Sequence, residues 1–238
     1  MRGKYDIVYM VKDSAPNEEL RYSLRSIEKN WGPHGNVWIF GGCPDGIAPD
    51  RFVPVEMILP GKWENTHRLM KIICQTADIS EDFWFFNDDF FVMRPASEDM
   101  PQMYNGTIPE VIRAVESPDA GVRYWTDQLH ILDDLFRREG MSCLNYEVHK
   151  PMLINRRKML DVMDRYRTIL FTRSLYGNVF HIGGEDGGDV LVKYAYGNID
   201  WVLDQSFVST TEDSFAKGEI GERIRGRFPQ PCAWEVQT

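Results

Sequence analysis

Short apolar runs alternate with helical patterns over the first 90 residues of this 238-residue chain, and this order limits the folds open to it. The strand-like runs, rich in β-branched and aromatic residues, are residues 5–11, 37–40, 53–59 and 83–86. Apolar positions at helical spacing cover residues 18–31 and 64–75. Strands that alternate with helices predict an α/β fold, with a mostly parallel sheet and helices on both of its faces.

Polar or glycine-rich segments follow three of these runs directly. They are Lys12-Asp13, Gly41-Gly42 and Asn87-Asp88-Asp89. In open α/β sheets, ligands bind beyond the carboxyl ends of the strands. We therefore expect the three segments to share one mouth of the sheet.

The second half of the chain is less regular. Helical patterns cover residues 126–139 and 155–166, and residues 202–211 resemble a late strand. Residues 183–188 form a glycine-rich stretch without the Lys-Ser/Thr of a phosphate-binding P-loop, which is typical of a surface loop or a lid. The chain thus predicts one domain with an irregular C-terminal half.

The Asn87-Asp88-Asp89 triplet carries the clearest chemical signal. Two adjacent carboxylates among aromatic residues are costly to bury unless they are paired or bound to a metal. At a strand end they can hold Mg²⁺ or Mn²⁺, which in turn bridges a diphosphate. In a strand, Asp88 and Asp89 would point to opposite faces, so that one binds metal and the other the donor sugar. The same triplet is also typical of a simple turn.

Other side chains are candidates for parts of a site. His149, in Glu147-Val148-His149-Lys150-Pro151, is a metal ligand, a general base or a structural imidazole. Arg173 can meet phosphate, or it belongs to an ordinary turn. The candidate general bases are Asp89, His149, Asp186 and Asp213. The basic tail residues Arg223, Arg225 and Arg227 either clamp an anion or form a solvated face.

Charge and composition narrow the classes of partner. The net charge of −9 disfavours non-specific binding to nucleic acid. No apolar run approaches the roughly 18 residues that span a bilayer. The four widely spaced cysteines and the lack of a signal-peptide pattern favour a cytoplasmic protein without disulfide bonds.

Three stretches together resemble the Stealth family, which includes bacterial capsular-polysaccharide sugar-phosphotransferases and the lysosomal-enzyme N-acetylglucosamine-phosphotransferase. They are the Asn-Glu-Glu-Leu-Arg-Tyr-Ser-Leu-Arg-Ser-Ile-Glu-Lys helix of residues 17–29, Val-Trp-Ile-Phe-Gly at 37–41, and residues 83–91 with Phe-Asn-Asp-Asp-Phe-Phe. The resemblance covers residues 5–93. It implies a GT-A-like, Rossmann-like fold, a divalent metal and a uridine-type nucleotide sugar as donor.

The resemblance also implies roles for individual residues. Asp88 and Asp89 would serve metal and donor, and Lys12 and Asp13 would lie near the nucleotide. Arg21 and Arg25 would lie near the donor phosphates or the sheet. His149 resembles the later histidine block of the family.

The sequence therefore predicts a single catalytic domain, with a nucleotide-sugar-binding half at 1–95 and an acceptor half at 96–238. Its activity would be metal-dependent transfer of a sugar from a nucleotide sugar to an acceptor hydroxyl. The catalytic candidates are Asp89, His149 and Asp213; the metal candidates are Asp88, Asp89 and His149; the donor-binding candidates are Lys12, Asp13, Arg21, Arg25, Asn87 and Arg173.

Three alternatives to this activity stay open from the sequence. They are transfer of a sugar 1-phosphate to a glycan, glycosylation of a DNA base, and a non-catalytic module that binds a nucleotide sugar or glycan. A base-modifying enzyme needs a basic groove, for which the tail arginines are the one hint.

Overall fold

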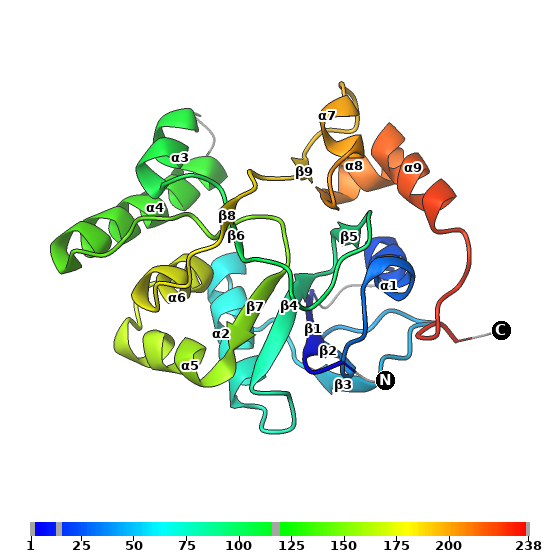
Figure 1. The fold of residues 1–238 in the computed structure, drawn as a ribbon, viewed down its shortest axis with the longest axis horizontal. Helices are drawn as coiled ribbons and strands as arrows, with labels where there is room; N and C mark the ends of the chain where they lie inside the picture. The colour runs from blue at the N-terminus through cyan, green and yellow to red at the C-terminus, as the bar shows by residue number, and fades with distance from the viewer. Residues whose placement is uncertain (1–2, 13–15, 116–119, 237–238) are drawn as a thin grey trace.

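A five-stranded, mainly parallel sheet forms the centre of the molecule in the computed structural model, which describes residues 3–12, 16–115 and 120–236 (Figure 1). The strand order is β3-β2-β1-β4-β7. The strands are β1 (Asp6–Val11), β2 (Val37–Gly41), β3 (Arg51–Pro54), β4 (Asp82–Asn87) and β7 (Met152–Asn155). Only β7 among them pairs antiparallel, against β4. The mixed α/β fold predicted from the sequence is thus confirmed, and its order is consistent with a Rossmann-like sheet.

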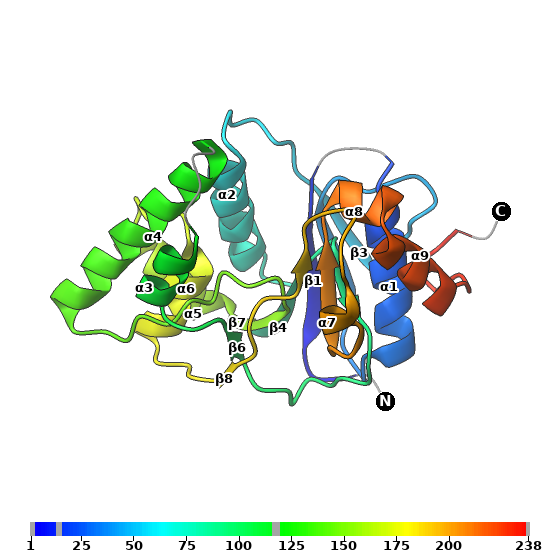
Figure 2. The same cartoon turned by 90° about the horizontal axis from the view of Figure 1, so that it is seen from above.

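Helices cover both faces of this sheet, because successive side chains of its strands point to opposite sides. Ile7 and Tyr9 of β1 join the core on the side of α1 (Glu18–Asn30), whereas Val8 and Met10 join the core under α2 (Lys62–Gln75). Figures 1 and 2 show α1 on one side and α2, α5 (Arg156–Arg165) and α6 (Thr172–Val179) on the other.

The beginning of α1 follows directly from its sequence. The Asn17 side chain accepts a hydrogen bond from the backbone N–H of Leu20 at 2.9 Å, which caps the helix, and Glu18 and Glu19 lie in the first turn. Leu20, Leu24 and Ile27 are fully buried against the sheet, as their spacing predicts. This capping fixes the first turn of α1 next to the carboxyl end of β1.

A second, three-stranded sheet was not predicted from the sequence. Its order is β5-β10-β9, formed by β5 (Phe90–Val92), β10 (Phe207–Thr210) and β9 (Leu191–Val192). Its strands are two to four residues long, too short to show a periodic pattern. The remaining elements are β6 (Met103–Tyr104), α3 (Ile108–Ala114), α4 (Ala120–Glu139), β8 (Glu185–Asp186), α7 (Asp200–Leu203), α8 (Glu212–Lys217) and α9 (Glu219–Arg227).

Several predicted boundaries are wrong. The strand expected at 53–59 lies at Arg51–Pro54 and ends at the proline, which cannot donate a ladder hydrogen bond. The strand expected at 202–211 is confined to β10, because the short helix α7 takes up residues 200–203. The predicted helix at 126–139 starts earlier, at Ala120.

No helix within the described ranges combines the length and apolar character needed to cross a bilayer.

The C-terminal segment is held on α1 by a charged clamp. The Glu235 carboxylate accepts hydrogen bonds from Arg25 at 2.6 and 2.8 Å and from Arg21 at 2.9 Å. Its side chain is only 4% exposed. Burial raises the pKa of Glu235, but hydrogen bonds from Arg25 and the Cys232 backbone outweigh it and bring that pKa to about 2.

We expect Glu235→Gln to lower the free energy of unfolding by about 1–3 kcal/mol at neutral pH, since it leaves Arg25 short of its partner. Because the pKa of folded Glu235 lies below its ordinary value of 4.5, this stabilisation is present above pH 4.5 and is lost as the pH falls toward 2. Urea unfolding at several pH values measures it. Glu222→Gln is the matched control, because Glu222 is an exposed residue of α9, and this variant should change the free energy of unfolding little.

Candidate functional site

Asp88 and Asp89 form the two-residue turn through which the chain leaves the large sheet and enters the small one. Asn87 is the last residue of β4, where it pairs with Met10 of β1, and Phe90 opens β5. The four aromatic residues before Asn87 and the two after Asp89 are buried, and they anchor both ends of the turn. The expectation that the two acids lie in a strand is therefore wrong, whereas their position at the carboxyl end of β4 is confirmed.

Asp88 faces the first turn of α1. Its carboxylate accepts a hydrogen bond from the side-chain amide of Asn17, the same residue that caps the helix. Burial, followed by the charge of Asp89, raises the pKa of Asp88 to about 6, against the opposing effect of the Asn17 hydrogen bond. The protein thus holds this carboxylate in surroundings that disfavour its negative charge.

Asp89 faces the small sheet. The Ser209 hydroxyl of β10 donates to its carboxylate at 2.8 Å, and Ser209 is also the register partner of Phe90. Burial raises the pKa of Asp89, although the charge of His149 and the Ser209 hydrogen bond act in the opposite direction. The N-cap residue of α1 therefore holds one acid, and a strand of the small sheet holds its neighbour.

Glu19 adds a third carboxylate that the sequence reasoning missed. It lies in the first turn of α1 and accepts a hydrogen bond from the Thr210 hydroxyl at the end of β10. Burial raises the pKa of Glu19 to about 8; the Thr210 hydrogen bond opposes this rise, and the charges of Asp89 and Asp88 add to it. A carboxyl group with this pKa is largely protonated at neutral pH unless a cation lies nearby.

Positive charge is scarce around these acids. Within the described residues, neither Asp88 nor Asp89 forms an ion pair with lysine, arginine or histidine at 4.0 Å or less. Lys62, the exposed first residue of α2, lowers the pKa of both carboxyls through its charge. The acid pair thus has a cation on its outer side and none in direct contact.

His149 stands beside Asp89 and is bound by Asp189. Its Nδ1 lies 2.8 Å and 3.0 Å from the two Asp189 carboxylate oxygens, and its backbone N–H donates to Asp189 at 2.9 Å. The edge of its ring meets Phe90 at a centroid distance of 6.4 Å. Burial raises the pKa of Asp189, but the hydrogen bond and the charge of His149 outweigh it, so that this pKa is lowered.

The donor set suits a hard divalent cation. Mg²⁺ and Mn²⁺ prefer oxygen ligands, and Mg²⁺ is often held by one or two carboxylates together with substrate phosphates and water. No group of three or more His, Cys, Asp or Glu side chains in the described part of the chain is arranged to hold a metal alone. Asp88 and Asp89 could supply two carboxylate ligands, and a cation held there would need its other ligands from outside the described side chains. Because Nδ1 of His149 is bound to Asp189, only Nε2 is left for a ligand or a proton.

Other predicted site residues lie in different places. Lys12 follows β1 at the expected mouth and is exposed, and Asp13 lies outside the described residues. Arg21 and Arg25 bind Glu235, and Arg173 donates to Glu147 and to the Val148 carbonyl. These three arginines are thus engaged in holding the fold together.

The remaining base candidates and the basic tail are also engaged locally. Asp213 forms an exposed ion pair with Lys217 at 2.7 Å, and Asp186 accepts from the backbone N–H groups of Gly106 and Gly188. The tail arginines have partners of their own: Arg223 binds Glu219, Arg225 binds Glu18, and Arg227 donates to the Met93 carbonyl. Each of the three therefore has a partner within the chain.

The site residues that sequence reasoning missed are Glu19, Lys62, Asp189 and Ser209. Glu19 and Lys62 open helices whose N-termini face the carboxyl edge of the sheet, so their positions follow from the predicted topology. Ser209, Thr210 and Asp189 belong to the small sheet or precede it, and nothing local in the sequence pairs these strands with β5.

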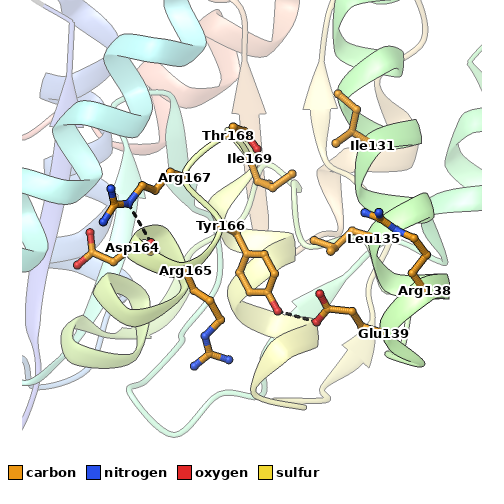
Figure 3. A pocket seen from close by; sticks show the side chains of 10 residues that line it. All are labelled: Ile131, Leu135, Arg138, Glu139, Asp164, Arg165, Tyr166, Arg167, Thr168 and Ile169. Atoms are coloured by element: carbon orange, nitrogen blue, oxygen red, sulfur yellow. Dashed lines mark hydrogen bonds between the residues drawn. The ribbon is translucent and has the colours of Figure 1, made fainter.

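A pocket of about 520 Å³ lies away from the acids, between α4 and the segment after α5 (Figure 3). Ile131, Leu135 and Ile169 give it an apolar side, and arginines line its rim. Its polar groups bind each other: Tyr166 donates to Glu139 at 2.7 Å, and Arg167 to the Asp164 carbonyl at 3.1 Å.

No protein-family model matches the sequence, and a search of curated proteins finds no match.

The raised pKa values of Glu19 and Asp88 predict how stability depends on pH in the presence of a chelator. For a carboxyl whose folded pKa is raised, the stabilisation is complete below its unfolded value and is lost as the pH rises through the folded value. In chelator, the free energy of unfolding should therefore fall as the pH rises from 4.5 to about 8, because Glu19 loses its proton in the folded protein over this range.

We expect Glu19→Gln to reduce this loss by a few degrees in melting temperature, since about 1 kcal/mol corresponds to about 2–4 °C in a domain of this size. Thermal unfolding from pH 5 to 8.5 measures it. Glu18→Gln is the control: the hydrogen bond from Arg225 lowers the pKa of Glu18, so this variant should not flatten the curve. If the melting temperature of Glu19→Gln depends on pH in the same way as that of wild type, the raised pKa of Glu19 is contradicted.

Proposed function

We propose that this protein is a metal-dependent transferase that moves a sugar from a nucleotide-sugar donor to an acceptor hydroxyl. One observation carries the proposal: two adjacent carboxylates stand at the carboxyl end of a strand of the central sheet, and neither forms an ion pair with a lysine, arginine or histidine among the described residues. Ligands of open α/β sheets bind at this edge, and uncompensated carboxylates there attract a divalent cation.

The charge pattern favours a phosphorylated donor over a neutral ligand. A diphosphate and a pair of carboxylates repel each other unless a cation lies between them. Asp88 and Asp89 would hold Mg²⁺ or Mn²⁺ from the protein side, and the cation, when bound, would neutralise charge on the departing nucleoside diphosphate. Lys12 and Lys62, at the exposed ends of β1 and α2, supply further positive charge at the same rim.

His149 is the base that the geometry favours. A proton on Nδ1 can be donated to Asp189, which leaves the lone pair of Nε2 to accept the proton of an acceptor hydroxyl. The side chain is about one-third exposed, so an acceptor can reach it. Asp186 and Asp213, which the sequence offered as alternatives, are engaged elsewhere.

The resemblance of residues 5–93 to the Stealth family supports a nucleotide-sugar donor. It also points to the principal alternative to sugar transfer, which is transfer of a sugar phosphate. In that alternative the acceptor oxygen attacks the β-phosphorus, and the sugar 1-phosphate is transferred. Both reactions use the same metal and the same donor, and they differ in the bond that breaks.

We expect the protein to hydrolyse or transfer at least one UDP-sugar in the presence of Mn²⁺ or Mg²⁺ and to be inactive in chelator. Asp88→Asn and Asp89→Asn should each lower the rate by about 100-fold or more while the melting temperature holds or rises. Asp204→Asn, an acid that is 92% exposed and paired with Arg94, is the control.

A donor labelled in the β-phosphate separates the two reactions, because the label reaches the acceptor only when the sugar phosphate moves. Turnover that is unchanged in chelator would remove the metal from the proposal. A protein that binds UDP-sugars with Mn²⁺ but never turns them over would be a binding module.

A further inference from the structure

The glycine-rich segment at residues 183–188, for which the sequence predicted a surface loop or a lid, is held in place by several hydrogen bonds. Its β8 strand pairs in parallel with β6, the Gly187 N–H donates to the Tyr104 carbonyl at 3.0 Å, and the Tyr146 hydroxyl donates to the Gly183 carbonyl at 2.8 Å. Lys150, only 4% exposed, donates from its ammonium group to the Gly187 carbonyl. This network holds the backbone that leads into Asp189.

Asp189 is the residue that this loop presents, and it binds His149 in two ways. One carboxylate oxygen accepts the His149 backbone N–H at 2.9 Å, and the Val190 N–H donates to the same oxygen at 2.9 Å. The other oxygen lies 2.8 Å from Nδ1 of the ring. The main chain and the side chain of His149 are thus fixed by a single carboxylate.

This arrangement selects one tautomer of the neutral imidazole. A carboxylate can only accept hydrogen bonds, so the proton must sit on Nδ1 and the lone pair on Nε2. Phe90, which directly follows Asp89, makes a T-shaped contact with the ring. Nε2, in contrast, forms no hydrogen bond with any of the described residues, whereas Nδ1 is bound to Asp189.

We propose that Asp189 is a positioning residue for the transfer reaction: it keeps Nε2 of His149 free and directed toward the acid pair, where it takes the acceptor proton. This inference rests on the proposed function. In the step concerned, the acceptor O–H proton moves to Nε2, the oxygen forms a bond to the anomeric carbon, and the carbon–oxygen bond to the nucleoside diphosphate breaks. The bonding pair leaves with the diphosphate.

If Asp189 had a purely structural role, only its hydrogen bonds from the backbone N–H groups of His149 and Val190 would matter, and the tautomer of the ring would not. Asp189→Asn separates the two roles. Its amide oxygen can still accept the His149 and Val190 N–H groups, while its NH₂ group, which donates, comes to face Nδ1. The proton of the neutral imidazole should then move to Nε2, so that the base is blocked while the loop stays folded.

The test reads the tautomer and the turnover in the same protein. ¹⁵N NMR of histidine-labelled wild type, with the His149 signals assigned by His149→Gln, should show a protonated Nδ1 and a bare Nε2 at a pH where the ring is neutral. Asp189→Asn should reverse this pattern and lower kcat by about 10²–10⁴-fold, with the KM for the donor changed less than threefold. Glu185→Gln, on the same loop and exposed, is the matched control and should keep both tautomer and kcat.

Each outcome has a defined meaning. A wild-type His149 protonated on Nε2 overturns the proposal without any variant, even if Asp189→Asn fails to fold. An Asp189→Asn protein that keeps kcat within threefold overturns it as well. If wild type turns over no nucleotide sugar, both the proposed function and the positioning role are contradicted. If Asp189→Asn moves the proton to Nε2 and turnover stays intact, only the positioning role is contradicted.

Discussion

The chain passes from its large sheet to its small sheet through two residues, and both carry a negative charge. Because Asn87 ends β4 of the large sheet and Phe90 opens a strand of the second sheet, Asp88 and Asp89 cannot move apart. Asn17 holds one carboxylate and Ser209 holds the other. The site depends on this enforced proximity, since two carboxylates in such surroundings are stabilised far better by a cation than by hydrogen bonds alone.

The two sheets contribute different residues to the site, and in the proposed reaction the large sheet would supply the donor side and the small sheet the acceptor side. Asn17, Glu19 and Lys62 come from the segments that follow β1 and β3, at the edge where nucleotides bind in sheets of this kind. Ser209 and Thr210 come from β10, and Asp189 comes from the segment before β9. An enzyme that joins two substrates needs such an arrangement, in which each substrate meets residues from a different layer.

Sequence reasoning could predict the large sheet because its signals are local. The buried strand at Asp6–Val11, the capped helix after Asn17 and the aromatic run before Asn87 each occupy one continuous window, and together they place the acids correctly at a strand end. The small sheet depends on pairing between segments more than 100 residues apart, such as Phe90 with Ser209, and no window of sequence contains that information. Arg21 and Arg25 illustrate the same limit, since their partner Glu235 lies over 200 residues away and its pairing is invisible to spacing.

The raised pKa values of Glu19 and Asp88 have a consequence for protein engineering. Uncharged residues at these two positions would relieve repulsion among the acids, and at Asp88 they would also remove a group that the proposed activity requires. A library selected for heat resistance alone would therefore drift toward glutamine or asparagine there and would enrich robust but inactive molecules. If the proposed metal-dependent activity holds, selection in the presence of a divalent ion would oppose that drift at Asp88, because a bound ion would stabilise the charge that burial and Asp89 disfavour.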